Sequence, residues 1–167
     1  MTYRDATPAD AAAIDALFRE SFRATFGHLY APEDLASFLG WFTVAAWAAE
    51  LADPAFAFRV IEDADGIAGY CKLGPISLPA EPEGPALELR QLYLLDRAKG
   101  SGAAQALMDW ALATARARGA AELWLSVYID NHRAKRFYQR YGFEDRGPYA
   151  FLVGNHADED RLMRLVL

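Results

Sequence analysis

Apolar residues recur along the chain with helical spacing in some stretches and with strand spacing in others. Residues 2–6 predict a short strand, and Thr7-Pro8-x-Asp10 then predicts a helix start with Thr7 as its N-terminal cap. A helix that reaches about Phe26 follows, and Gly27 is expected to end it. Its apolar face consists of residues three or four apart: Ile14, Leu17, Phe18 and Phe22.

Two shorter helices and a β-hairpin are predicted next. The patterns are, in chain order, a helix from Pro32, a helix from about Val44 to Leu51, a strand Phe56–Glu62, a turn Asp63–Gly66 and a strand Ile67–Leu73. Tyr30, Trp41 and Phe42 between these helices either pack in the core or form a wall of a substrate pocket. Residues 75–85 contain four prolines and predict an exposed loop without regular structure.

The remaining chain alternates strands and helices. We expect a strand before Leu94, a helix from about 103, a strand Glu122–Ile129, a short helix capped by Asp130 or Asn131 and ended by Gly142, and strands Phe143–Val153 and Leu162–Leu167. Residues 155–160 are predicted to form a polar loop between the last two strands. This order predicts a single domain over residues 1–167, of the α/β (α+β) class, with a mixed, mostly antiparallel sheet of six or seven strands and helices on both faces.

Composition and charge exclude several classes of protein. A chain of 167 residues, 53% hydrophobic and 24% charged, is typical of one globular domain. The net charge of −6 disfavours nonspecific nucleic-acid binding and suits cationic partners. The N-terminus has no apolar signal core and no apolar run approaches membrane-spanning length, so we expect a cytoplasmic protein without membrane contact.

Cysteine and histidine offer little chemistry of their own. The single cysteine, Cys71, excludes an internal disulfide, and its apolar surroundings favour a buried inert thiol over a nucleophile. The histidines, His28, His132 and His156, are widely spaced and have no companion ligands, so we expect no metal.

Residues 86–103 combine an apolar strand, a glycine turn and the start of an amphipathic helix. Gly100 and Gly102 permit close approach of a ligand to the backbone, and Arg97 and Lys99 add positive charge. The free N–H groups and positive dipole end of the next helix favour a phosphate or pyrophosphate there. The alternative is an ordinary strand–helix connection. The dinucleotide fingerprint fits poorly because Gln105 stands where its third glycine belongs, and the P-loop pattern is absent.

Two motifs together indicate a family. Arg97-x-x-Gly100-x-Gly102 resembles the Q/R-x-x-G-x-G/A pyrophosphate signature of the GCN5-related N-acetyltransferases, the GNAT superfamily. About 30 residues later, Asn131-x-x-Ala134-x-x-Phe137-Tyr138-x-x-x-Gly142-Phe143 is similar to the stretch that closes the acetyl-CoA site in that family. By itself this second segment is also a capped amphipathic helix with aromatic core residues. Further similarity to the PaiA-type polyamine acetyltransferases comes from Glu20-Ser21-Phe22, Thr25-Phe26, Trp124-Leu125-x-Val127, Gly147 and Gly154-x-x-x-Asp158.

The resemblance implies a cofactor site for acetyl-CoA without a metal. In that family the pantetheine arm pairs with the central strand, and here the matching residues are Leu92, Tyr93 and Leu94. The residues expected around the pyrophosphate are Arg97, Ala98, Lys99, Gly100, Ser101, Gly102 and Ala103. Asn131 is expected to contact the cofactor arm, and a backbone N–H near Leu94 to stabilise the thioester oxygen.

The resemblance also implies two catalytic residues. Tyr138 is expected to protonate the departing sulfur as general acid; the alternative is a core tyrosine with a structural hydrogen bond. Glu88 is the candidate base, acting through water; its alternative is a salt bridge to Arg90 or a neighbouring arginine. Arg90 departs from the acidic residue that PaiA-type relatives have at that place.

The implied function is transfer of an acetyl group to a primary amine of a small cationic, polyamine-like molecule, by direct attack in a ternary complex. The alternatives are a protein or peptide N-terminal or lysine acetyltransferase, or a noncatalytic CoA-binding sensor. A homodimer through the late strands is possible, because Tyr149 and Phe151 are expected to be exposed aromatics there.

Overall fold

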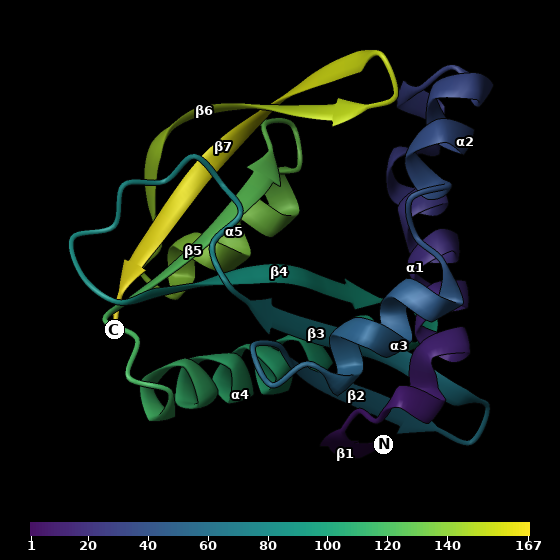
Figure 1. Ribbon diagram of the computed structural model, residues 1–167, viewed down its shortest axis with the longest axis horizontal. Coiled ribbons are helices and arrows are strands. Elements are labelled where there is room, and N and C mark those ends of the chain that lie inside the picture. Colours follow the sequence, from purple (N-terminus) through teal and green to yellow (C-terminus); the bar gives the residue numbers. More distant parts are fainter.

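One seven-stranded sheet forms the centre of the protein, as a computed structural model of residues 1–167 shows (Figure 1). The strands lie in the order β1-β2-β3-β4-β5-β7-β6, and every neighbouring pair is antiparallel except β4 and β5. The predicted mixed, mostly antiparallel sheet is therefore confirmed. The strands are β1 Thr2–Asp5, β2 Ala57–Asp63, β3 Gly66–Gly74, β4 Ala86–Leu94, β5 Glu122–Tyr128, β6 Glu144–Val153 and β7 His156–Val166.

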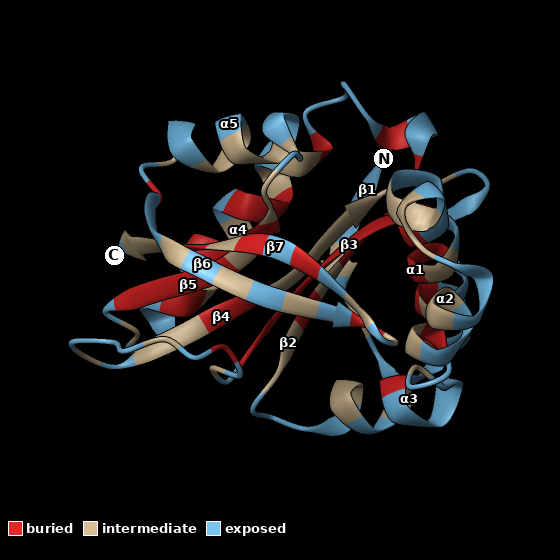
Figure 2. Cartoon of the chain, turned by 90° about the horizontal axis from the view of Figure 1, so that it is seen from above, coloured by how far each residue is buried: buried red, intermediate tan, exposed pale blue.

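Helices cover both faces of this sheet, as predicted (Figure 2). They are α1 Ala11–Phe26, α2 Pro32–Leu39, α3 Val44–Ala52, α4 Ala103–Ala117 and α5 His132–Arg140. Thr7 is the N-terminal cap, as expected, of a 3₁₀ turn, Pro8–Asp10, that leads into α1, and its backbone N–H donates to the Asp10 carboxylate at 2.7 Å. At the other end of α1 the chain continues through a 3₁₀ turn, Gly27–Leu29, before α2.

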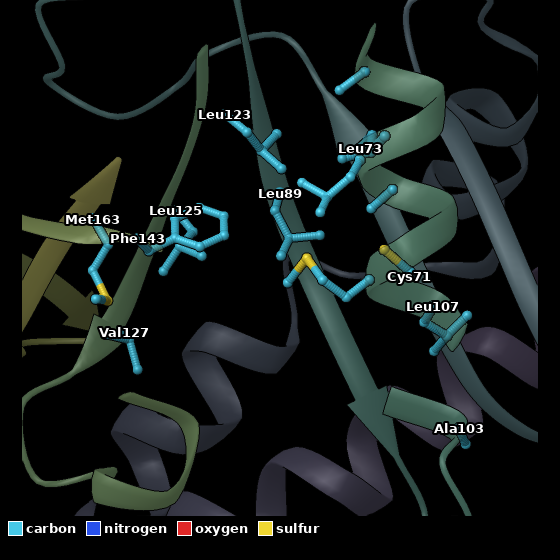
Figure 3. Close-up of a cluster of buried hydrophobic side chains, with 14 of the residues drawn as sticks. Cys71, Leu73, Leu89, Ala103, Leu107, Leu123, Leu125, Val127, Phe143 and Met163 are labelled. Carbon is cyan, nitrogen blue, oxygen red and sulfur yellow. The ribbon is translucent and has the colours of Figure 1, made fainter. Parts of the chain in front are cut away.

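The helices bury two separate hydrophobic cores. The first lies between the sheet and α4, where side chains of β3, β4, β5 and α4 converge around Leu107, Leu123 and Cys71 (Figure 3). The second lies under α1, α2 and α3 and contains Phe18 and Trp47. Burial raises the pKa of the Cys71 thiol far above its usual range, so the thiol is protonated and inert, as expected.

A bulge in β4 sets which of its side chains reach which core. Lys72 of β3 pairs with Gln91 and Leu73 pairs with Leu89, so Arg90 is an extra residue in β4. Leu89 and Leu92 consequently face the same core although they are three residues apart. The bulge lies just where β4 also loses its partner on the other side.

The parallel pairing of β4 with β5 is short. It covers Ala86 to Glu88 of β4 and Glu122 to Trp124 of β5, and there it stops. Beyond this point the two strands run apart (Figure 1). Residues 89–94 of β4 and 125–128 of β5 therefore form a gap in the middle of the sheet, called the β4–β5 gap below.

The polar loop predicted at residues 155–160 is wrong. Val153 pairs with His156, so β6 and β7 are joined by a two-residue turn, Gly154–Asn155, and β7 begins at His156. Glycine supplies the positive φ of +57° that such a turn needs. A run of acidic residues is typical of a loop, but here the residues form a strand whose side chains point alternately to its two faces. Asp158 and Asp160 lie on the buried face.

One stretch of the chain is long and apolar enough to count as a candidate membrane span, although none was expected. Pro32–Ala52 spans 21 residues, and an 18-residue window within it has a mean hydropathy of 1.4, which by length and composition alone is enough to cross a membrane. The helix ends at Leu39 and a new one begins at Val44. Both α2 and α3 are far shorter than the roughly 20 residues that a membrane-spanning helix needs. Both helices cover the second core through residues such as Leu39 and Trp47.

Gly154 also fixes how the β6–β7 hairpin meets α2. A Cβ at this position would lie 2.7 Å from the Cα of Asp34, whose carboxylate accepts a hydrogen bond from the Asn155 N–H at 2.9 Å. Gly119 has a similar backbone, with φ of +81°, but a Cβ there meets nothing. Substituting both glycines therefore distinguishes the cost of backbone strain, which both share, from that of steric overlap, which only Gly154 has.

We expect Gly119→Ala to lower the free energy of unfolding by about 1 kcal/mol, from left-handed strain alone. Gly154→Ala should cost about 1–3 kcal/mol more, because overpacking against the α2 backbone adds to the strain. Urea denaturation of both variants measures the difference. Equal losses for the two would contradict the packing described here.

Candidate functional site

The β4–β5 gap opens into the main cavity of the protein, with a volume of about 800 Å³. Its floor consists of residues 89–94 of β4 and 126–128 of β5. The glycine turn and α5 line one end, and α1 and β7 line the other. The cavity is therefore one continuous channel with two chemically different halves.

The β4 edge at this gap suits an extended ligand. Leu92, Tyr93 and Leu94 all line the cavity and pair only with β3, so the backbone groups on their other side have no β5 partner. An extended chain with amide groups can pair with such an edge as an added strand. Pairing of these three residues with the pantetheine arm stays a prediction.

The glycine turn after β4 adopts the conformation that an anion site requires. Gly100 and Gly102 have φ of +75° and +84°, and a Cβ at Gly100 would project into open space. Gly102 is the N-terminal cap of α4, whose first N–H groups are free of intrahelical partners. Lys99, Gly100 and Gly102 line the cavity, whereas Ala98 and Ala103 are buried beside it.

Arg97 does not supply the positive charge that the sequence suggested. Its Nε donates to Asp63 Oδ2 at 2.7 Å and its Nη2 to the Ile67 carbonyl at 3.1 Å, so its side chain holds the β2–β3 hairpin. Ser101 likewise donates to the Ala98 carbonyl at 2.7 Å and does not line the cavity. The groups of this motif that line the cavity are therefore the backbone of the turn and the Lys99 side chain.

A row of arginines on α5 provides positive charge instead. Arg133, Arg136 and Arg140 lie three and four residues apart on one helix face, and all three line the cavity. None of them forms an ion pair within the protein, unlike Arg97 or Arg161. The row was overlooked in the sequence, where the only signal was the spacing of cations within a helix.

The second motif places Asn131 and Tyr138 at the same end. The Asn131 side chain caps α5 by accepting the Ala134 N–H at 3.3 Å, and it also lines the cavity. Tyr138 lies in the cavity wall with its ring packed 5.8 Å from that of Phe143. Burial raises the pKa of Tyr138 well above its usual value, so its hydroxyl holds its proton at neutral pH.

Aromatic residues line the other half of the cavity. They are Phe18, Phe22, Phe26, Tyr30, Phe38, Phe42, Tyr93 and Phe151. Tyr30 and Phe42 thus contribute to the pocket wall, whereas Trp41 is 82% exposed and points away from it. Phe151 is half-buried in this wall and Tyr149 is half-buried beside Trp124, so neither is the exposed aromatic that was expected on β6.

Two buried aspartates lie at the end of the aromatic half of the cavity. Asp158 and Asp160 are 7% and 6% exposed, and both line the cavity from β7. Asp158 accepts a hydrogen bond from the Tyr30 hydroxyl, and its Oδ1 lies 3.0 Å from His156 Nε2. The sequence showed Asp158 only as part of a motif and gave no sign of Asp160, because the alternation of the strand was not recognised.

Glu88 lies outside the cavity. Its Oε1 accepts hydrogen bonds from the Ser77 N–H at 2.8 Å, the Ser77 hydroxyl at 2.9 Å and the Leu78 N–H at 3.3 Å. Its other oxygen is 3.6 Å from Arg90 Nε, which is the salt-bridge alternative considered above. Glu88 thereby ties down residues 75–85, which have no regular structure, as predicted, but contain the buried Leu78.

Comparison with known proteins places the chain among acetyltransferases. The model of the acetyltransferase (GNAT) family matches residues 12–143. An uncharacterized N-acetyltransferase of Mycobacterium tuberculosis is 36% identical over 155 residues, which cover 92% of this chain and 96% of the relative. An uncharacterized N-acetyltransferase of Lactobacillus delbrueckii subsp. lactis is 30% identical over 154 residues, 91% of this chain and 89% of the relative.

A solved structure shows the same fold over almost the whole chain. The PaiA N-acetyltransferase from Thermoplasma acidophilum, in complex with coenzyme A, superimposes with a TM-score of 0.79. The match covers 99% of this chain and 98% of that one, at 19% sequence identity. At this identity the likeness concerns the fold.

The placement of Glu88 predicts a structural role. Glu88→Ala would leave two N–H groups of the loop without an acceptor and should lower the free energy of unfolding by about 1–3 kcal/mol. Glu81→Ala, an exposed position in the same loop, should change it by less than about 0.5 kcal/mol. Denaturant unfolding measures both, and a Glu88→Ala protein as stable as wild type would refute this role.

Proposed function

The chain belongs to the acetyltransferase (GNAT) family, and we propose that its acceptor is the primary amine of a small cationic, polyamine-like molecule. The family uses acetyl-CoA, which supplies an acetyl thioester. We further propose that the amine attacks this thioester directly while both substrates are bound. The residues of the two cavity halves support these assignments in different ways.

The cofactor half fits the parts of acetyl-CoA. The free edge of β4 at residues 92–94 is suited to the amides of the pantetheine arm, and the turn at Gly100 and Gly102 to the pyrophosphate. The unpaired arginines of α5 and Lys99 add positive charge for the phosphates. The ion pair with Lys99 lowers the pKa of Asp96, and the charge of Arg133 on α5 adds to this effect.

The acidic end of the aromatic half is the observation that carries the acceptor assignment. Asp158 and Asp160 are buried side chains in a cavity whose remaining wall there is largely aromatic. Buried carboxylates are costly without a positive partner, and aromatic faces attract cations. A substrate with one or more ammonium groups on an aliphatic chain meets both requirements.

Tyr138 is the group we propose as general acid. It lines the cavity beside the β4 edge, and its hydroxyl is protonated at neutral pH, so it carries a proton for the departing sulfur. Its hydroxyl takes part in no hydrogen bond of the protein, in contrast to that of Tyr141, which donates to Asp109 Oδ1 at 3.0 Å. This disfavours the alternative of a tyrosine held by a structural hydrogen bond.

A panel of acceptors tests the proposed function. Release of free thiol from acetyl-CoA is measured with spermidine, spermine, aminoglycosides, amino acids and short peptides. Turnover with the polyamines, at a KM between micromolar and millimolar, is expected. Turnover with peptides alone would contradict the cationic small-molecule acceptor, and binding of acetyl-CoA without any turnover would favour the noncatalytic sensor.

We expect Tyr138→Phe to lower kcat by about 10²- to 10⁴-fold while the KM for acetyl-CoA changes little, because only the transferable proton is removed. Tyr141→Phe is the matched control, since Tyr141 does not line the cavity and its hydroxyl donates to Asp109, and it should retain activity. Steady-state kinetics measures both. A Tyr138→Phe enzyme with wild-type kcat would exclude the acid role.

A further inference from the structure

We propose that Asp160 is the proton acceptor for the attacking amine, and that Asp158 anchors the positive charge of the same substrate. This assignment rests on the proposed function and gives the reaction the base that Glu88, outside the cavity, does not supply. It starts from the placement of two carboxylates on one strand, both aimed into the cavity where the β4–β5 gap opens.

Asp160 lies among tyrosines from three other strands. In the sheet it is paired with Tyr128 of β5 on one side and Tyr149 of β6 on the other. Tyr93 of β4 is near enough that both Tyr138 and Asp160, after burial itself, contribute to its raised pKa. The proposed acid and the proposed acceptor therefore share Tyr93 as a neighbour.

The groups that face Asp160 make its carboxylate a weak acid. Its pKa is raised to about 7, first by the loss of water around it and then by the charge of Asp158, while Ser126 of β5 acts in the opposite direction. The other titratable neighbours are phenols: Tyr30 before α2, Tyr93 on β4, Tyr128 on β5 and Tyr149 on β6. Neither lysine nor arginine acts on Asp160 to hold it ionised.

Asp158 has a different environment although it is only two residues away. The Tyr30 hydroxyl donates to one of its oxygens and His156 Nε2 lies 3.0 Å from the other. These partners fix the carboxylate and leave further lone pairs free for an ammonium group. Two neighbouring carboxylates with such unequal surroundings suit unequal roles, one as a fixed negative charge and one as a group that gains and loses a proton.

The proton transfer balances with the rest of the reaction. The ammonium nitrogen gives one proton to a carboxylate oxygen of Asp160, and its freed electron pair forms the bond to the thioester carbon as the carbon–sulfur bond breaks. The sulfur takes the Tyr138 proton, and the second proton of the nitrogen restores that hydroxyl. Asp160 then releases its proton to water, so the products are one amide, one thiol and one proton.

The pH profile of substituted enzymes tests the assignment. For wild type we expect kcat/KM to rise through about pH 7, because Asp160 accepts a proton only as the carboxylate. Asp160→Asn should lower kcat by at least about 100-fold and abolish this rise. Glu159→Gln, an exposed neighbour on the same strand, is the charge-matched control and should keep both rate and profile.

Asp158→Asn should behave differently from Asp160→Asn. It should raise the KM for the cationic acceptor more than it lowers kcat, and move the rise in activity to lower pH, because removal of its charge makes Asp160 a stronger acid. A buried structural role for Asp160 would instead lower activity equally at every pH. An Asp160→Asn enzyme with the wild-type rate and profile would overturn the proposal.

The inference and the proposed function can fail separately. If peptides and not polyamines are acetylated, the proposed acceptor class is wrong. The pH dependence of kcat/KM for Asp160→Asn, measured with the peptide, then still tests whether Asp160 accepts the proton. A measurement without turnover uses protein with ¹³C-labelled aspartate carboxyls, where Asp160→Asn identifies the Asp160 resonance. Titration of that resonance near pH 7 is expected, and titration near the ordinary aspartate value of about 3.9 would overturn the assignment.

Discussion

The loss of pairing between β4 and β5 is the constraint on which the functional architecture depends. Three residue pairs hold these parallel strands together, and beyond Glu88 and Trp124 they diverge. A sheet that splits in its middle exposes backbone donors and acceptors that a bound chain can satisfy, at a place where both faces are already covered by helices. The cavity, the glycine turn and the two aspartates are all arranged along this gap.

Buried carboxylates at the closed end of the gap hold the loop that precedes β4. Glu88 fastens the 75–85 loop, and Glu122 accepts the N–H groups of Glu83 at 2.6 Å and Gly84 at 3.1 Å while it lies 3.3 Å from Arg164. Such buried carboxylates have their partners within the protein. Asp160 lacks a cationic partner, and this difference separates the structural acids of the chain from the one that we assign to proton transfer.

Much of the architecture could be predicted because it depends on local patterns. Helical spacing and capping residues located α1 to α5, and Gly100 and Gly102 located the turn between β4 and α4. What failed depended on distant partners: the Arg97 side chain is taken by Asp63 of a hairpin 34 residues earlier in the chain, and Asp160 faces inward only because Val153 pairs with His156. A polar run in sequence cannot distinguish a loop from a strand that borders a cavity.

Acetyl-CoA is expected to bind as an added strand in the β4–β5 gap. Hydrogen–deuterium exchange with and without saturating coenzyme A tests it most directly. We expect slower exchange in residues 89–94 of β4 and in the turn at 100–106, with no change in the β1–β2 pair at the sheet edge. Unchanged exchange across residues 89–94 while coenzyme A is bound would contradict the claim.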